Sequence, residues 1–285
     1  HLHVDATRWR HLWVKRGENG WLWVFVGVDT TVYRIADSRA HEVVLHYLGL
    51  QEGEPAGRVV TLVCDFMKAY DALHNQVERA RCWVHYRRLI LECRTRCPRD
   101  PAMIRWVDQW MEMVDDFFHF WYERRNAAPG SPEWEDADLT LRGCAEEMEF
   151  VRTQQLGRPD LPPDARRVLD LGDAHWPELT RCVEDPAIPP DNNPAERALR
   201  TPVNERKNFY GSGAPWAARF AAQMWTVLMT VRQNGLNPLA LLIAYLTACA
   251  EAGGQAPDDL ERFFPWALCD EDRAALSQPP EVGYG

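Results

Sequence analysis

Three carboxylates occupy positions from which they could share a metal ion. Asp5 lies in a short apolar segment near the start of the chain, and Asp65 directly follows the apolar run VVTLVC. Glu196 comes 131 residues after Asp65, at the start of a predicted helix. Ligand sites in mixed α/β sheets form beyond the ends of strands, where residues distant in sequence meet. Three converging carboxylates would suit Mg²⁺, a hard cation that prefers oxygen ligands.

A pair of Mg²⁺ ions held by such acids would be suited to cleaving or forming phosphodiester bonds. Ions about 3.5 to 4 Å apart clamp the attacking and leaving oxygens of a phosphoryl displacement. Each acid also has a structural interpretation: Asp65 could begin a turn, and Asp5 could be a charge on an edge strand. Glu196 has the spacing of a capping box from Asn193, with Pro194 at the first helical position. Spacing alone favours these structural interpretations, so the surrounding sequence has to decide.

Basic and amide side chains follow the third acid and offer contacts for phosphate. They are Arg197 and Arg200 on one face of the predicted helix, and Arg206, Lys207 and Asn208 in a predicted loop before Gly211-Ser212-Gly213. Such side chains bind phosphate oxygens, and glycine permits a close approach of the backbone. The alternative is a solvated helix face on which Arg197 pairs with Asp191.

A second basic segment, residues 79–88, interleaves arginines with aromatic side chains. Its arginines are Arg79, Arg81, Arg87 and Arg88, and its rings belong to Trp83, His85 and Tyr86. We expect Arg87 and Arg88 to contact DNA phosphates. The structural alternative places Trp83 and Tyr86 in the core, with His85 as a hydrogen-bonded structural histidine.

Strands and one helix are predicted for the first hundred residues. Beside the segment 2–7, continuous apolar runs of strand length occur at 21–28, 32–35 and 59–64. Between them, residues 38–48 carry apolar side chains at helical spacing, with Ser38 as the N-cap. These elements would place Asp5 within a strand and Asp65 at the carboxyl end of another.

From Pro101 onward, the spacing of apolar residues is the spacing typical of helices. Apolar residues from Ile104 to Trp121 recur at intervals of three and four, which predicts an amphipathic helix of about seven turns. Its aromatic side chains indicate a core or a dimer seam rather than a base-stacking surface. Further helices are predicted at 133–155, from 164 to 170 or beyond, at 194–200 and at 216–234, followed by a helical and then acidic tail.

The net charge of −10 argues at first against a nucleic-acid partner. The charge is uneven, however: residues 106–186 carry −11 and 236–285 carry −6, whereas 76–105 carry +5 and 187–235 carry +3. The segments with candidate phosphate contacts are therefore basic. Eight scattered cysteines without a C-x-x-C pair predict a reducing cytoplasm. The longest apolar stretch, 239–250, is too short for a membrane span.

From Asp191 the chain reads DNNPAERALRTPVNERKNFYGSG, which resembles the signature of the insertion-sequence-sixty-six family of bacterial DDE transposases. In that family an Asn-Asn-x-x-Glu-Arg helix carries the last catalytic acid. Further matches, in the family's order, are Asp5-Ala6-Thr7, Asp65 with Tyr70, the segment CWVHYRR from Cys82 and the segment NGLNP from Asn234. The resemblance covers about residues 1 to 250. The chain departs from the family's pattern at Ala6, Phe66, Met67 and Glu205.

The resemblance implies an α/β fold, with a ribonuclease-H-like mixed-sheet core and an all-helical insertion before the last acid. The core would comprise residues 1–100 and 187–235, the insertion 101–186, and a C-terminal helical and acidic tail 236–285. This division assigns the acidic charge to the insertion and the tail.

The resemblance also implies that Asp5, Asp65 and Glu196 are the catalytic, metal-binding acids. They would bind two Mg²⁺ ions, with Mn²⁺ as a substitute, and catalyse DNA strand cleavage and strand transfer. The implied partners are DNA, as transposon ends and target duplex, a further copy of the chain in a homo-oligomer, and accessory proteins. The implied location is the bacterial cytoplasm, on the nucleoid when DNA is bound, with no membrane association.

Two other interpretations share these acids. A ribonuclease-H-like two-metal nuclease would cut DNA without strand transfer, and only a transposase joins a precleaved 3′-hydroxyl to a second duplex. A domesticated derivative would keep the fold and bind DNA without catalysis, and an absence of metal binding would support it. A two-carboxylate glycosidase would leave the basic segment 206–208 unexplained.

Overall fold

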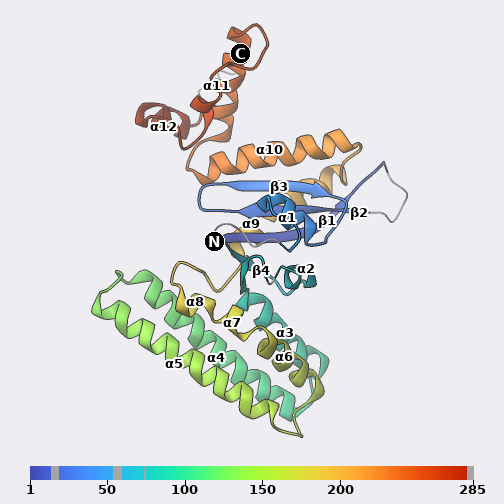
Figure 1. The fold of residues 1–285 in the computed structure, drawn as a ribbon, viewed down its shortest axis with the longest axis vertical. Coiled ribbons are helices and arrows are strands. Elements are labelled where there is room, and N and C mark those ends of the chain that lie inside the picture. The colour runs from blue at the N-terminus through green and yellow to red at the C-terminus, as the bar shows by residue number, and fades with distance from the viewer. Residues whose placement is uncertain (14–18, 54–59, 74, 281–285) are drawn as a thin grey trace. The chain divides into compact units, whose positions relative to one another are not determined.

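The computed structural model describes residues 1–13, 19–53, 60–73 and 75–280 (Figure 1). The chain divides into two compact units. The meander unit comprises Leu2–Val43 and Pro194–Gly285, and the helical unit comprises Val44–Asn193 together with His1. Strands and helices occur in both units, which confirms the predicted α/β class.

Three antiparallel strands form the sheet of the meander unit: β1 (Leu2–Arg10), β2 (Asn19–Val26) and β3 (Thr31–Ala36). The predicted strands in this part of the chain are confirmed. Asp5 lies opposite Val24, and Val24 lies opposite Tyr33. Directly opposed side chains share one face of a sheet, so these three residues point to the same side.

Two helices cover that face and one edge of the meander. Ala195, Ala198 and Leu199 of α9 (Asn193–Phe209) form a core with Val24 and Tyr33. The neighbouring helix α10 (Pro215–Gln233) adds Ala222 and Trp225 to that core. Threonine hydroxyls of α10 accept hydrogen bonds from the backbone N–H groups of β3, so the outer edge of β3 is not left open.

Helix α9 is longer than the sequence predicts. The sequence predicts a helix at 194–200, and a proline at 202 would be expected to stop it, because proline inside a helix removes one backbone hydrogen bond. The structure shows a continuous helix to Phe209 with Pro202 in its interior. Pro202 cannot donate to the carbonyl oxygen of Ala198, and the hydroxyl of Tyr33 donates to it instead at 2.8 Å. The prediction that residues 206–208 form a loop is therefore wrong.

The remainder of the meander unit is helical. The helix predicted at 216–234 is confirmed as α10, and α11 (Pro238–Glu251), the short 3₁₀ helix η1 (Glu261–Phe263) and α12 (Asp270–Ser277) follow. Val231, Leu236 and Leu241 form a small core at the junction of α10 and α11. Within the described part of the chain, no helix combines the length and the apolar character needed to cross a bilayer.

The helical unit begins within α1 (Glu42–Leu48). The predicted start at Ser38 is wrong, because the Ser38 hydroxyl accepts from the N–H of Ala40 in a local turn before the helix. Strand β4 (Thr61–Cys64) confirms the described part of the run predicted at 59–64; Val59 lies outside the described residues. It pairs in parallel with β5 (Glu78–Arg81), with the short helix α2 (Lys68–Asp71) between them.

Five helices follow α3 (Trp83–Arg96) and account for most of this unit's core. They are α4 (Pro101–Asn126), α5 (Pro132–Leu156), α6 (Pro163–Ala174), α7 (Trp176–Leu179) and α8 (Arg181–Glu184). The helices predicted from Pro101, at 133–155 and from 164 are confirmed, and α4 and α5 lie side by side (Figure 1).

The three tryptophan side chains of α4 are buried, as predicted for a core, whereas Phe118 and Phe120 are half-buried and Tyr122 is exposed. Trp110 is fully buried, and Trp106 and Trp121 are nearly so. The indole N–H groups of Trp106 and Trp110 both donate to the side-chain oxygen of Gln155 on α5, at 2.9 Å each. These rings stabilise the pair of long helices and present no surface to a base.

Candidate functional site

Asp5 lies in the middle of β1, on the face of the meander that α9 covers. Its side chain is half-buried, and Oδ1 accepts a hydrogen bond from the N–H of Ala6 at 2.7 Å. The register places Asp5 level with Tyr33 two strands away. Because Tyr33 in turn bonds to Ala198, the level of Asp5 along the sheet is also the level of the first turns of α9.

Glu196 lies in the first turn of α9, two residues before Ala198. It is half-buried, and its neighbour Ala195 is fully buried against the meander. Just before the helix, the Asp191 carboxylate accepts from the N–H of Asn193 at 2.9 Å. The local sequence thus begins the helix three residues before Glu196.

Strand β1 and helix α9 run in the same direction, which brings Asp5 and Glu196 to similar levels along the two elements. Arg206 donates to the carbonyl oxygen of Arg8, so the far ends of the two elements also meet. Eight helical residues from Ala198 to Arg206 span about 12 Å. Three strand residues from Asp5 to Arg8 span about 10 Å. The helical and strand segments are of similar length, so Ala198 lies near the level of Asp5. Glu196, two residues before Ala198, therefore lies within about one helical turn of that level.

Asp65 belongs to the helical unit, where it directly follows β4 as predicted. Its Oδ1 accepts from the N–H of Met67 at 2.8 Å, which is the local turn expected of an aspartate at this position. Its carbonyl oxygen accepts from the guanidinium of Arg81 at 2.6 Å. Phe66 packs beside Tyr86 and His175, so the bulkier residue of this chain fills a defined place.

A buried ion-pair cluster holds the turn at Asp65. Arg81 is 1% exposed and pairs with Glu178 of α7 at 2.6 Å and with Asp71 of α2. Glu178 also accepts from Arg79 and lies 3.2 Å from Nδ1 of His175. Burial raises the pKa of Glu178, but the His175 hydrogen bond and the charges and hydrogen bonds of the arginines outweigh it, and the pKa falls to about 2.

Sequence reasoning missed this cluster. Arg79 and Arg81 stand in the basic segment expected to face DNA, yet both guanidinium groups are engaged by Glu178, 99 and 97 residues away. Arg87 pairs with Asp115 on α4 at 3.1 Å, while Arg88 is exposed. The strand that carries both arginines was not predicted either, because three of its four residues are charged and it shows no apolar run.

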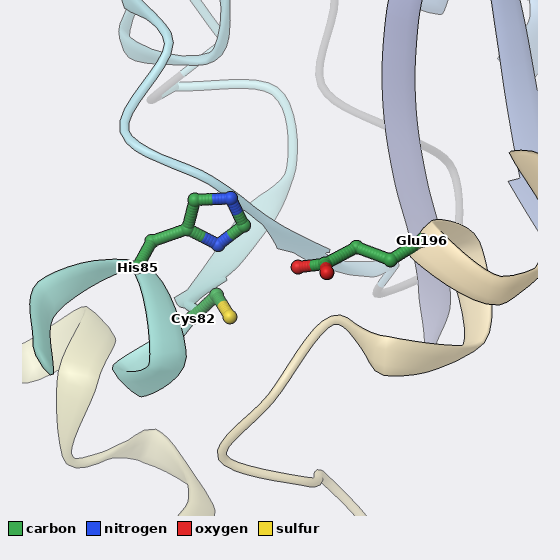
Figure 2. Close-up of side chains that lie close together, drawn as sticks. All are labelled: Cys82, His85 and Glu196. Atoms are coloured by element: carbon green, nitrogen blue, oxygen red, sulfur yellow. The ribbon is translucent and has the colours of Figure 1, made fainter. Parts of the chain in front are cut away.

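The start of α3 carries Cys82 and His85, and Figure 2 shows their side chains together with that of Glu196 on α9. Within the helical unit, the backbone N–H of Asn192 donates to the sulfur of Cys82 at 3.3 Å. Trp83 is fully buried, and its indole N–H donates to the carbonyl oxygen of Leu179 at 2.7 Å. Tyr86 is also fully buried, so the structural interpretation of these two aromatic residues is confirmed.

The basic residues of α9 lie on two parts of the helix. Arg197 and Arg200 are exposed near its start, one turn apart. Lys207 and Asn208 are exposed in the last turn, beside the half-buried Arg206. Glu205, a departure from the family's pattern, accepts from the indole N–H of Trp225 at 2.8 Å, which explains an acid within this basic segment.

Comparison with known proteins identifies the group to which these elements belong. Residues 1–220 match the family described as "Transposase IS66 family", and the chain belongs to that family. It is 25% identical over 267 residues to "Uncharacterized protein y4qI" of Sinorhizobium fredii (strain NBRC 101917 / NGR234), covering 86% of this chain and 46% of that protein.

A shorter match joins the chain to a second protein of the same strain. The chain is 33% identical over 91 residues to "Uncharacterized protein y4hP", covering 32% of this chain and 16% of that protein. The chain thus spans less than half the length of the curated relatives it matches.

Proposed function

We propose that the chain is the catalytic region of a transposase that cuts the ends of an insertion sequence and joins them to target DNA. Asp5, Asp65 and Glu196 would be the three acids of a DDE site in a ribonuclease-H-like core. The observation that carries the proposal is the alignment of β1 with α9, which brings Glu196 near the level of Asp5 along β1. Membership of the transposase family supports the reaction class.

The donor set fits Mg²⁺. Carboxylate oxygens are the ligands that Mg²⁺ uses, and Asp5 and Glu196 are half-buried rather than freely solvated. One oxygen of Asp65 accepts the N–H of Met67, and no described residue hydrogen-bonds to its other oxygen. Two bound Mg²⁺ ions, or Mn²⁺ in their place, would activate the attacking oxygen and neutralise charge on the phosphate. The proposal requires Asp65 to join the other two acids.

The chain's own residues would position the DNA. Arg197 and Arg200 are exposed on the turns that follow Glu196, so phosphates held there would lie next to the acids. Arg206, Lys207 and Asn208 would hold the same strand farther along, and Arg87 and Arg88 would contact a second segment. Arg206 donates to Arg8, which fixes its guanidinium relative to β1. Positioning of this kind lowers the entropy cost of the reaction.

The proposed organisation keeps the boundaries expected from the resemblance. Residues 1–100 and 187–235 would form the catalytic core, 101–186 the helical insertion, and 236–285 the tail. The partners would be transposon ends, target duplex, a further copy of the chain and accessory proteins. The protein would act in the bacterial cytoplasm, bound to the nucleoid when it engages DNA.

A cleavage and joining assay tests the proposal. A labelled duplex ending in the inverted repeat that flanks the gene is incubated with Mg²⁺ and a supercoiled target. We expect Asp5→Asn, Asp65→Asn and Glu196→Gln to abolish both steps. Asp29→Asn is the matched control, because Asp29 is exposed in the turn between β2 and β3. Retained activity in any of the three variants would refute the assignment of that acid.

A second substrate separates transposase from nuclease. The same end is supplied already cut, with a free 3′-hydroxyl, so that only joining remains to be catalysed. Joined product is expected from a transposase and not from a hydrolytic nuclease. Cleavage of the intact end without joining of the precut end would replace the proposal with the nuclease interpretation.

A further inference from the structure

Four cations surround a hollow at the end of β1, away from Asp5. The hollow has a volume of about 390 Å³ and is lined by Arg8, Trp9, Arg10, Arg206, Lys207 and Tyr210; we call it the basic hollow. Arg8 and Arg10 alternate with the buried Trp9, and both are exposed. No acidic side chain lines it, so the local field attracts anions.

The cations of the basic hollow differ from those of the helical unit. In the helical unit most arginines pair with carboxylates, as Arg94 does with Asp108 and Arg124 with Asp138. Within the described part of the chain, none of the four cations of the basic hollow has an acidic partner. Their charge is therefore available to a ligand.

An aromatic ring on a strained backbone stands beside these cations. Tyr210 has φ +65°, the one positive φ of a non-glycine residue among the described residues. Its side chain is 65% exposed, and the neighbouring Phe209 is 43% exposed. Bulky residues rarely adopt this backbone conformation, and such strain concentrates at functional sites.

The segment after Tyr210 is fastened to the end of β1. Ser212 donates its N–H to the carbonyl oxygen of Arg10 at 3.0 Å and accepts from the N–H of Leu12 at 2.9 Å. Its hydroxyl accepts from the indole N–H of Trp9 at 3.0 Å. A Cβ on Gly211 would lie 2.1 Å from the Arg10 carbonyl oxygen, so the two segments touch closely. These contacts hold the backbone that follows Tyr210 in place before any ligand binds.

We propose that the basic hollow binds an unpaired DNA strand, with phosphates on Arg8, Arg10, Arg206 and Lys207 and a base stacked on Tyr210. An exposed ring stacks on a base only where that base has left the duplex, whereas four cations alone would suit any phosphate backbone. The ring therefore specifies single-stranded or frayed DNA. This inference rests on the proposed function and adds Arg8, Arg10 and Tyr210 to the residues that bind DNA.

Binding measurements without divalent metal test the proposal independently of catalysis. Fluorescence anisotropy of the full chain in EDTA compares a blunt duplex with the same duplex bearing a single-stranded 3′ tail. The wild-type chain should bind the tailed duplex more tightly. The logarithm of the affinity for the tailed duplex falls linearly with the logarithm of the salt concentration, and Arg8→Gln and Arg10→Gln should each make that slope shallower by about 0.7. Arg232→Gln, an exposed change on α10, should leave the slope unchanged.

Variants of Tyr210 test the stacked base. Tyr210→Ala should weaken binding to the tailed duplex by about 5-fold or more and leave blunt-duplex affinity unchanged. Tyr210→Phe should keep the preference for the tail. Tyr210→Gly removes the ring but accepts a positive φ, so it serves where the alanine variant folds poorly. Loss of blunt and tailed binding in equal measure would overturn the base-stacking assignment.

The outcomes separate this inference from the proposed function. If Tyr210 variants lose the tail preference while Asp5→Asn still binds the tailed duplex, the basic hollow is a DNA-binding site whether or not the chain proves catalytic. If the wild-type chain cuts and joins DNA but shows no tail preference, this inference alone is refuted. Equal or tighter binding of an RNA tail of the same sequence would overturn the assignment to DNA.

Discussion

The hydroxyl of Tyr33 donates a hydrogen bond to the carbonyl oxygen of Ala198 across 2.8 Å. In an uninterrupted helix that oxygen would accept from the N–H of residue 202, but Pro202 has none. Burial, followed by the nearby charge of Glu205, raises the pKa of Tyr33, so the phenol remains a donor at neutral pH. A strand thus supplies the hydrogen bond that keeps the helix of Glu196 continuous.

Tyr33→Phe should therefore destabilise the fold by about 1 to 3 kcal/mol, because a buried carbonyl oxygen is left without a donor. The cost should shrink in a Pro202→Ala background, where residue 202 regains an N–H for Ala198. Urea unfolding of the four chains of this double-mutant cycle measures the coupling. Equal costs in the two backgrounds would show that the phenol does not replace the lost bond.

Gly211→Ala should disrupt the junction between α9 and β1. Gly211 has φ +140°, and the added Cβ would meet the backbone oxygen of Arg10, which cannot rotate away. We expect a loss of at least about 1 kcal/mol in unfolding free energy, measured by thermal or urea denaturation. Gly213→Ala is the matched control, since no atom lies within 4 Å of its Cβ position. Similar losses in both variants would contradict the close approach.

The ion pairs of Glu178 near Asp65 should make part of the folding stability depend on pH in the acid range. The pKa of Glu178 falls from 4.5 to about 2 in the folded chain, so its contribution to stability is complete above about pH 4.5 and is lost as the pH falls toward 2. The difference in urea midpoint between wild type and Glu178→Gln should be constant at neutral pH. It should narrow between pH 4.5 and 2. A difference that grows in acid would contradict the sign of the shift.

Metal binding can be measured without DNA. Electron paramagnetic resonance of Mn²⁺ titrated into the chain reports binding to the proposed acids. Asp5→Asn and Glu196→Gln should each weaken binding by at least about 10-fold, since lesser changes around metal sites already cost that much. Asp29→Asn should bind like the wild type. An unchanged Mn²⁺ affinity in both acid variants would refute their assignment as metal ligands, and an absence of Mn²⁺ binding by the wild type would support a DNA-binding derivative without catalysis.

Local sequence patterns predicted most elements and the position of each acid along them. The apolar runs around residue 5 and before residue 65 are strands, and Glu196 does begin a helix. The long amphipathic helix from Pro101 appeared in the sequence because its buried face repeats every three to four residues. These patterns are local, so a single sequence reveals them.

Contacts between distant segments decided what local patterns could not. Pro202 predicts the end of a helix, and only a hydroxyl 165 residues from Ala198 keeps that helix intact. Arg81 carries the same charge as any exposed arginine, and only the fold brings Glu178 to it. The sequence by itself determined which residues could bind metal and phosphate. The tertiary structure determined which of the described cations pair with acids and which do not, because hydrogen bonds and ion pairs depend on distance in space.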